Sequence, residues 1–555
     1  MSLPAVVRPS VVLCTLNARY VHASLGLRCL LANMGAMRAQ TALCEFTIAR
    51  APLEMAHTLL ELLGPQRPGQ VQVVGFGVYI WNVRQTGTLL QVLRDLRPGL
   101  KVVLGGPEVS HELDSQPLLA LADHVITGWG DVTFPRLCQA LLHGPRPLMR
   151  VMAGEQPPLD TLALPYAEYT DADLAHRVVY VEASRGCPFK CAFCLSALDR
   201  TAWAFDLPRF LAALDGLYRR GARNFKFVDR TFNLKTAAAM QILQFFLDRL
   251  PAPGAIGAGA GLSVHFELIP DHLPERLKVA IARFPAGVLQ FEVGIQTFDP
   301  EVQRRIHRVQ DNDRTEANLR WLRAHSEAHV HADLIFGLPG ESLAGFARGF
   351  DRLRALRPHE IQLGVLKRLR GTPLTLQTHG SGLVFDAEPP YAVRETADVH
   401  ADDVQRFQRL ARYWDLIANS GRFRRTLELL LPPADSEDAA SAFGAFLRWS
   451  DWLWARSGTT HGLAPEQLVD HLADYLLIER GVGAAQVEQA LLEDYLASGA
   501  RARPQRLRAR LRPGATPVRK LSGAGLPRQN QHLAQSPEKA QTAPVGGGAG
   551  LEFRR

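Results

Sequence analysis

Short strand-like segments alternate with helical stretches through the first two thirds of this chain, and those near the amino terminus are largely free of internal polar residues. Four such strands lie near the amino terminus, at residues 10–16, 71–80, 101–106 and 123–128. Apolar strands that are joined by helices are typical of parallel β–α–β units whose sheet is covered on both faces. The pattern predicts a doubly wound, Rossmann-like domain over residues 1–145.

A longer alternation follows a polar link. The segment 146–177 contains several prolines and few apolar runs, so we expect it to be a linker. Residues 178–390 are then predicted to form a partial (β/α)6 barrel, because six successive β–α units are what a parallel barrel requires. The strands of these units are expected at 178–184, 224–229, 264–268, 289–296, 330–339 and 361–367.

The strand pattern stops near Pro390. Residues 391–500 are helical in period and rich in leucine and alanine, which predicts an α-helical domain with the aromatic run 443–458 in its core. We expect residues 501–555 to form a disordered basic tail, because they have little periodicity. This tail holds twelve basic and two acidic residues, which accounts for the formal net charge of +8. The charge of the whole chain therefore does not predict nucleic-acid binding.

Three of the seven cysteines are clustered. Cys187, Cys191 and Cys194 stand in C-x3-C-x2-C spacing just after the first barrel strand. Three thiolates on one short loop can hold three irons of a [4Fe-4S] cluster and leave the fourth iron open. A structural zinc site would need a fourth protein ligand, and no cysteine follows Cys194.

With these residues the chain resembles the radical S-adenosylmethionine (SAM) superfamily. An aromatic residue precedes the last cysteine, and four segments resemble strand-end motifs of that superfamily: FKFVDRTFN (225–233), EVGIQTFDPEVQRRIHR (292–308), DLIFGLPGES (333–342) and RGTPL (370–374). The resemblance implies an enzyme whose [4Fe-4S] cluster reductively cleaves SAM to a 5′-deoxyadenosyl radical. It also implies an electron donor of the flavodoxin or ferredoxin type and an organic substrate that the sequence does not identify.

Candidate contacts for SAM lie where the barrel strands end, because a barrel builds its site at the carboxyl ends of its strands. By resemblance, Phe193, Glu267, Gln296 and Asp333 are expected to contact SAM. Asp229 follows the second barrel strand. For Asp229, a role near the amine of SAM and an ordinary loop or helix-capping hydrogen bond both remain open.

The first 145 residues resemble the cobalamin-binding domain that is often joined to such barrels. The segments that carry this likeness are NARYVHASLG (17–26), LGGPEVS (104–110) and TGWGDVTFPRL (127–137). Glycines at strand ends would let a nucleotide tail approach the backbone closely. The implied cobalamin contacts are Asn17, His22, Gly26, Gly105, Gly106, Gly128 and Gly130. The likeness extends to a group with a C-terminal helical domain of unknown role, and methyl transfer is one outcome that it implies.

His22 departs from the D-x-H-x-x-G pattern in which a histidine ligates cobalt, since Gly26 lies four residues later. Ligation of cobalt, contact with the corrin ring and capping of the following helix remain open, and ligation is the role that the spacing favours least.

Two other functions remain open. A methylthiotransferase-like nucleic-acid modifier without cobalamin could use the basic tail, but the chain has no further cysteines for a second cluster. A non-enzymatic iron–sulfur sensor would not need the segments around Gln296 and Asp333. Because no run of 18 apolar residues and no secretory-signal pattern occurs, we expect a cytoplasmic protein without a membrane or nucleic-acid partner.

Overall fold

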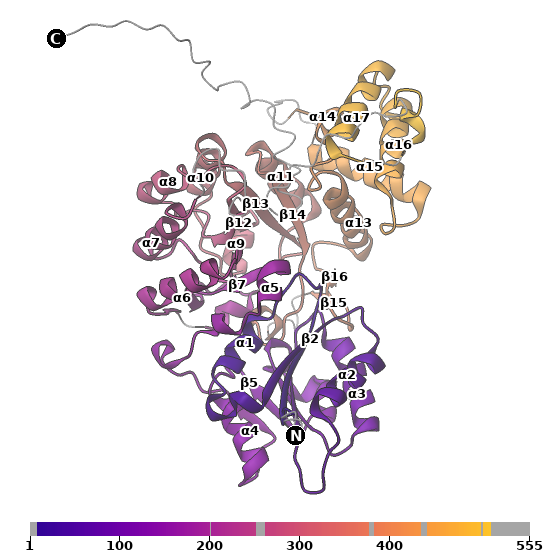
Figure 1. Ribbon diagram of the computed structural model, residues 1–555. Helices are drawn as coiled ribbons and strands as arrows, with labels where there is room; N and C mark the ends of the chain where they lie inside the picture. The colour runs from indigo at the N-terminus through magenta and orange to yellow at the C-terminus, as the bar shows by residue number, and fades with distance from the viewer. Residues whose placement is uncertain are drawn as a thin grey trace, which may run out of the picture.

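Two parallel six-stranded sheets follow one another along the chain, and a helical domain comes last (Figure 1). The computed structural model describes residues 8–199, 201–250, 261–376, 382–433, 441–500 and 503–511. The predicted fold class, a doubly wound domain before a partial barrel and a helical region, is confirmed.

The first sheet has its strands in the order β2-β1-β3-β4-β5-β6, all parallel. These strands are β1 (Val11–Asn17), β2 (Thr41–Thr47), β3 (Val73–Gly77), β4 (Lys101–Gly105), β5 (His124–Thr127) and β6 (Val151–Ala153). The helices around it are α1 (Leu25–Ala32), α2 (Pro52–Leu63), α3 (Val83–Leu96) and α4 (Thr133–His143). Val12 and Cys14 of β1 pack with α2 and α3. Val11 and Leu13 pack with α1 and α4, so both faces of the sheet are covered.

Two strands of this sheet were not predicted. β2 is an edge strand whose central residues are half-buried, and it carries polar residues between its apolar ones. β6 has three residues and lies inside the segment 146–177 that was expected to be a linker. The same segment contains α5 (Asp171–His176), so it contributes regular structure and contacts between the two sheets.

The second sheet has the order β14-β13-β12-β11-β10-β7, so each long strand pairs with the strand of the preceding β–α unit. The strands are β7 (Val179–Val181), β10 (Asn224–Phe227), β11 (Ser263–Leu268), β12 (Leu289–Gln296), β13 (His329–Phe336) and β14 (Glu360–Val365). The helices are α6 (Leu207–Arg219), α7 (Thr236–Leu247), α8 (Glu275–Ile281), α9 (Pro300–Arg305), α10 (Asn312–His325) and α11 (Leu343–Ala355). Within the described residues β7 and β14 do not pair, so this sheet is an open, partial barrel.

Shorter elements surround the barrel. They are the antiparallel pair β8 (Ser184–Gly186) and β9 (Ala202–Ala204), the helix α12 (Pro373–Leu376), and the antiparallel pair β15 (Val384–Phe385) and β16 (Val393–Glu395).

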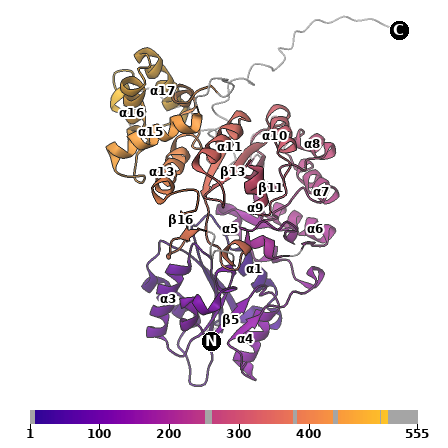
Figure 2. The same ribbon diagram turned by 180° about the vertical axis from the view of Figure 1, so that it is seen from behind.

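The helical domain packs against the barrel on the side away from the first domain (Figures 1 and 2). Its helices are α13 (Ala401–Ile417), α14 (Arg424–Leu430), α15 (Ala442–Ser457), α16 (Pro465–Asp474) and α17 (Ala484–Ser498). Phe443, Phe446 and Trp449 of α15 are buried, which confirms the aromatic run as core. The indole N–H of Trp414 donates to the carbonyl of Ile361 at 3.0 Å and joins α13 to β14.

Part of the predicted tail is folded. Residues 503–511 lie against α16 and α17, where Leu507 is buried and Arg510 pairs with Glu488. This stretch differs from the expected disorder because its two leucines complete the core of the helical domain. Residues 501–502 and 512–555 lie outside the described residues.

None of the described helices has the length and apolar composition that a crossing of the bilayer requires.

Candidate functional site: two cavities at the carboxyl ends of two sheets

The three clustered cysteines lie on the loop between β8 and β9, just beyond the carboxyl end of β7. Gly186, which opens this loop, has a φ of +93°, and a side chain there would collide with the carbonyl of Thr201. Cys187, Cys191 and Cys194 line one cavity of about 230 Å³, which we call the barrel cavity. The turn therefore brings all three thiols to a single site.

The ends of successive barrel strands supply the opposite wall of the barrel cavity. Glu267 comes from β11, Gln296 from β12 and Asp333 from β13, and Phe193 lies among the cysteines. The structure thus brings together four of the five residues expected to contact SAM. Their shared position follows from parallel pairing, which puts the carboxyl ends of neighbouring strands at one edge.

Gln296 has an unusual backbone for a residue with a side chain. Its φ is +70°, at a register shift in the pairing of β12 with β13. Its side-chain Oε1 is buried and has no hydrogen-bond partner. Strained backbone and an unpartnered acceptor that together face a cavity are typical of a ligand-binding position.

Ionisable side chains continue from the barrel cavity into the interior of the barrel. Glu292 accepts from His265 Nε2 at 2.9 Å and from Lys226 Nζ at 3.3 Å. His331 Nε2 lies 3.2 Å from Asp333 Oδ1. Burial opposes the charged form of His331, but the Asp333 carboxylate raises its pKa to about 9. The interior therefore contains charged groups in contact with the cavity wall, where barrels usually have branched apolar residues.

Two arginines of the barrel cavity were not singled out from the sequence. Arg230 donates to the Glu267 carboxylate at 2.8 Å, and Arg308 approaches Cys191 Sγ at 3.7 Å. Arg308 lies three residues beyond α9 and is the last residue of the segment 292–308 that contains Gln296, and that position was the available signal. Burial raises the pKa of Cys191, whereas Arg308 lowers it and so favours the thiolate.

Asp229 lies outside the barrel cavity. Its carboxylate accepts hydrogen bonds from the backbone N–H of Ala183 at 3.0 Å and from the hydroxyl of Ser184 at 2.6 Å. Burial raises the pKa of Asp229 to about 7 despite these hydrogen bonds. Of the two roles left open, the contacts fit the loop hydrogen bond, because Asp229 holds the start of β8 immediately before the cysteine loop.

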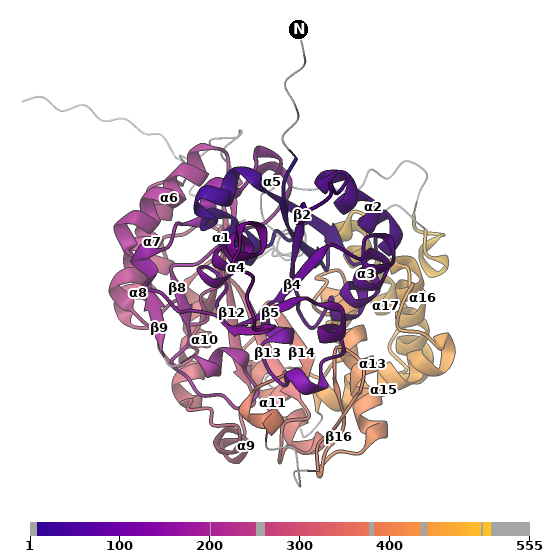
Figure 3. The same ribbon diagram turned by 90° about the horizontal axis from the view of Figure 1, so that it is seen from below.

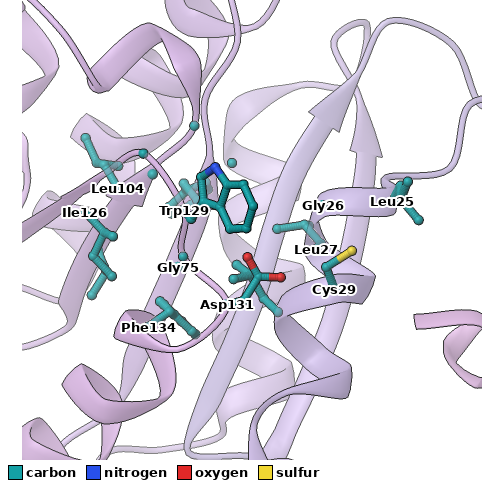
Figure 4. Close-up of a pocket in the computed structure, with 18 of the residues that line it drawn as sticks. Leu25, Gly26, Leu27, Cys29, Gly75, Leu104, Ile126, Trp129, Asp131 and Phe134 are labelled. Carbon is teal, nitrogen blue, oxygen red and sulfur yellow. The ribbon is translucent and has the colours of Figure 1, made fainter. Parts of the chain in front are cut away.

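A second cavity, of about 260 Å³, lies at the carboxyl edge of the first sheet (Figure 4), and we call it the first-domain cavity. Its walls are largely apolar and include Leu104, Ile126 and Phe134, whereas Asp131 and Arg185 supply charge. Gly75 forms part of its wall because a Cβ there would lie 2.6 Å from the Phe134 ring. The missing side chain of Gly75 thus makes room for the Phe134 ring in the cavity wall.

Five of the seven residues expected to contact cobalamin line the first-domain cavity, namely Gly26, Gly105, Gly106, Gly128 and Gly130. Gly106 has a φ of +104° and lies so close to Val78 that a Cβ would be 2.5 Å from its carbonyl oxygen. A Cβ on Gly105, by contrast, would meet only the Ile126 carbonyl, at an ordinary 3.7 Å. Gly105 therefore leaves space beside the backbone, which suits a flat nucleotide-like group, whereas Gly106 is needed for the close packing against Val78.

Asn17 and His22 do not line the first-domain cavity. Asn17 donates from Nδ2 to Glu45 at 2.9 Å. His22 Nδ1 lies 2.7 Å from the Tyr180 hydroxyl, on the first barrel strand. Burial lowers the pKa of His22, and nearby Lys226 lowers it further, so the ring is neutral at pH 7. Asn17 holds Glu45 within the first domain, and His22 joins the first domain to the barrel, so neither side chain faces the cavity.

One short segment joins the two cavities. Glu182 and Arg185 line the first-domain cavity, and Cys187 begins the barrel cavity. Arg185 donates to Asp131 at 3.0 Å and lies over the Trp129 ring, 4.7 Å from its centroid. The carboxyl edge of the first sheet therefore meets the cysteine loop directly.

The first domain lies against the barrel (Figures 1 and 3). We call this interface the seam, and the ion pairs that the described residues form across it include the partly exposed pair of Arg368 with Glu112 and three further sets. The first set is the Arg185–Asp131 pair. The second joins Arg370 Nε to Glu108 at 3.1 Å, with both side chains buried. The third is a buried network in which each arginine contacts both carboxylates, formed by Arg28, Glu45, Asp173 and Arg177.

The two cavities differ in how well their residues fit a metal or cofactor. Within the described ranges, no three His, Cys, Asp or Glu side chains are already arranged around one metal ion. The cysteine loop nevertheless has the donor set of an iron–sulfur cluster, because three thiols line one cavity beside a guanidinium group. The apolar, glycine-lined first-domain cavity fits an aromatic nucleotide tail better than a charged ligand.

Comparison with protein families identifies two parts of the chain. Residues 181–352 match the model of the radical SAM superfamily, and residues 379–517 match a family described as a protein of unknown function, DUF4080. The first match contains the three cysteines and most of the barrel strands.

One curated relative matches more than half of the chain. The cobalamin-dependent radical SAM methyltransferase TokK of Streptomyces tokunonensis is 23% identical over 345 residues, which are 56% of this chain and 49% of TokK. The chain spans less than half the length of the curated relatives it matches.

Two solved structures have a similar fold. The radical SAM methyltransferase TsrM from Kitasatospora setae, solved with tryptophan substrate and a SAM analogue, has a TM-score of 0.54 at 16% identity over 81% of this chain and 99% of TsrM. The cobalamin-dependent enzyme OxsB, solved with aqua-cobalamin and SAM, has a TM-score of 0.55 at 12% identity over 88% of this chain and 84% of OxsB.

Proposed function

Because this chain carries a radical SAM domain, we propose that the protein is a cobalamin-dependent radical SAM enzyme that transfers a methyl group to an organic substrate. The observation that carries the proposal is the segment Glu182–Cys187, because it lines the first-domain cavity at one end and the barrel cavity at the other. Two cofactors seated in these cavities would lie on either side of one short piece of chain.

Cys187, Cys191 and Cys194 would hold a [4Fe-4S] cluster. When bound, the cluster would supply the electron that cleaves SAM, and cobalamin would supply a carrier for the methyl group. The fourth iron, without a protein ligand, would be left for SAM itself.

The barrel cavity supports SAM binding through its charges. SAM carries a carboxylate, an ammonium group and ribose hydroxyls. Arg308 would pair with the carboxylate, and Gln296 and Asp333 would accept hydrogen bonds from hydroxyl or amine groups. Phe193 would cover an apolar part of SAM, and Glu267 would keep Arg230 fixed at the rim of the cavity.

The first-domain cavity supports cobalamin through Gly26, Gly105, Gly106, Gly128 and Gly130. An aromatic base would enter between apolar side chains without having to displace a Cβ. We assign Asn17 and His22 to the seam, and His22 would therefore not ligate cobalt. A reducing partner of the flavodoxin or ferredoxin type completes the proposal, since cleavage of SAM needs an external electron.

Anaerobic reconstitution with iron, sulfide and hydroxocobalamin tests the proposal. We expect iron–sulfur absorbance, one corrin per chain, and release of 5′-deoxyadenosine or S-adenosylhomocysteine from SAM after reduction. His22→Ala serves as the internal comparison, because bound cob(II)alamin should show no nitrogen hyperfine splitting in its electron spin resonance spectrum with or without this change.

Two results would contradict the proposal. A reconstituted cluster without any corrin binding would remove cobalamin from it. Nitrogen splitting that disappears in His22→Ala would show that His22 ligates cobalt after all.

A further inference from the structure

The first-domain cavity is apolar on most of its wall but charged at one end. Asp131, Glu182 and Arg185 supply the formal charges among its described lining residues. Two carboxylates meet one guanidinium group there, so this end has an excess of negative charge. A phosphate group would therefore be repelled from it, whereas a group that donates a hydrogen bond would be attracted.

The guanidinium group of Arg185 is already engaged by the protein. Its Nη1 donates to Asp131 Oδ2 at 3.0 Å, and its Nη2 and Nε donate to Glu182 at 2.5 and 3.4 Å. The same group lies over the ring of Trp129. Arg185 thus holds the two carboxylates in place, and recognition of a ligand is left to an atom that Arg185 does not pair.

Asp131 has such an atom. The residue is 5% exposed, and its Oδ1 is buried and accepts no hydrogen bond from the described residues. Figure 4 shows Asp131 among the residues that line the cavity, between Trp129 and Phe134. A buried carboxylate oxygen without a donor is unfavourable, and a ligand that brings an N–H group to it would relieve this cost.

The surroundings of Asp131 decide which part of a nucleotide tail can reach it. Phe134 and Ile126 are buried apolar residues of the same cavity wall. A group that reaches Asp131 must leave water, which costs least for an aromatic base and most for a phosphate. The ribose and phosphate would therefore stay toward the opening of the cavity, and the base would lie beside Asp131.

We propose that the first-domain cavity selects a corrinoid whose lower base carries an amino group, as adenine does, over one whose base is a benzimidazole. The exocyclic amino group would donate to Asp131 Oδ1, and the ring would lie against the apolar wall. A benzimidazole that is bonded to its ribose through one ring nitrogen has no N–H group to donate. The inference rests on the proposed function, because it requires a corrinoid in this cavity, and it adds the chemical class of the base.

Three corrinoids with different tails test the proposal on the full-length protein with its reconstituted cluster. They are cobalamin, whose base is dimethylbenzimidazole, the corresponding cobamide with adenine, and cobinamide, which lacks the nucleotide. Anaerobic equilibrium dialysis, followed by corrin absorbance, gives the three dissociation constants. We expect the parent protein to bind the adenine cobamide about tenfold more tightly than cobalamin, because its amino group gains a hydrogen bond to a charged acceptor.

Asp131→Asn removes the preference while it keeps the shape of the side chain. Arg185 can only donate, so the amide oxygen would stay on Arg185 and the amide NH2 would face the cavity. The two cobamides should then bind about equally, and binding of cobinamide should match that of the parent. Asp95→Asn is the matched control and should keep the preference, because Asp95 is exposed on α3 and does not line the cavity.

Two results would overturn this proposal alone. One is equal binding of cobalamin and the adenine cobamide by the parent. The other is a preference that persists in Asp131→Asn, because another group would then hold the amine. Failure of the parent to bind any of the three corrinoids is a separate result, since it would remove cobalamin from the proposed function and this inference with it.

Discussion

The first-domain cavity and the barrel cavity occupy equivalent places on two parallel sheets, yet they are built in opposite ways. The first has apolar walls, and its glycines Gly105 and Gly128 leave open space where side chains would stand. The second is defined by the side chains it presents, which are thiols, carboxylates and guanidinium groups. Parallel topology sets where a ligand lies, whereas the lining decides which chemistry it has.

This contrast predicts different ways to damage the two cavities. A cavity made by missing atoms is lost when atoms are added, and a cavity made by specific groups is lost when those groups are removed. The seam between them should respond to a change in charge, because ion pairs hold it together.

The largest effect is expected from removing one ligand of the barrel cavity. Cys187→Ala, Cys191→Ala or Cys194→Ala should each abolish iron–sulfur absorbance and SAM cleavage, because the remaining two thiols cannot hold a [4Fe-4S] cluster. Anaerobic absorbance spectra and product analysis measure this. Cys138→Ala, in the core of the first domain, should leave both unchanged. A full cluster in the triple cysteine variant would contradict the assignment of the barrel cavity.

Adding atoms to the first-domain cavity should have the next largest effect. The Cβ that Gly105→Val adds would lie at an ordinary 3.7 Å from the Ile126 carbonyl, so we expect the fold to survive. The branched side chain would instead fill the cavity and weaken corrin binding by about 100-fold, or about 2.7 kcal/mol. Equilibrium dialysis with hydroxocobalamin measures the change. Gly216→Val, at an exposed position of α6 with open space around it, is the control. Equal corrin binding by Gly105→Val and the parent would place the corrin elsewhere.

Removing ion pairs from the seam tests how much a buried pair between the first domain and the barrel stabilises the protein. Arg370→Ala leaves buried Glu108 without its cationic partner and should cost about 3 kcal/mol of stability. Arg368→Ala breaks a partly exposed pair with Glu112 and should cost about 1 kcal/mol or less. Differential scanning calorimetry with and without cobalamin distinguishes the two variants. Similar melting temperatures for both variants would show that the buried Arg370–Glu108 pair stabilises the protein no more than the partly exposed pair does.

The last effect is small at each step of pH, and it concerns the start of the cysteine loop. Because burial raises the pKa of Asp229 from 3.8 to about 7, the folded protein keeps a proton that the unfolded chain has released. Stability from this group is present at low pH and is lost as the pH rises to about 7, by at most about 1.4 kcal/mol per pH unit. Asp229→Asn should remove this part of the slope when melting temperatures are compared between about pH 5 and pH 8. An unchanged slope would mean that Asp229 is already ionised in the fold.

The fold was largely predictable because the strands of both sheets are buried and short. The apolar run 10–16 and the strand-like segment 289–296 are each followed by a helix of ordinary period, and parallel topology follows from that alternation. β2 was missed because an edge strand needs fewer apolar residues. Its Thr, Cys and Glu side chains interrupt the apolar run by which a buried strand is recognised in the sequence. β6 was missed because three residues are too few to give any pattern.

The candidate site was predictable where spacing along the chain decides contacts. The cysteines share one loop, and Glu267, Gln296 and Asp333 share one sheet edge. The direction in which a loop side chain points was not predictable. His22 turns toward Tyr180, which lies 158 residues later, and Asp229 turns toward Ser184. Glu292 and His331 could have been found, since each lies two residues before a cavity residue on its strand and therefore on the same face.

The seam also limits how this protein can be recombined with others. The arginines Arg177, Arg185 and Arg370 each have a carboxylate partner in the first domain, at Glu45, Asp131 and Glu108. A chimera that takes its first domain from another protein would leave Arg370 buried without a counter-charge unless the donor supplied an acid at the place of Glu108. Arg177 and Arg185 would each lose one partner and keep Asp173 and Glu182. A replacement first domain would therefore have to supply carboxylates at the positions of Glu45, Asp131 and Glu108.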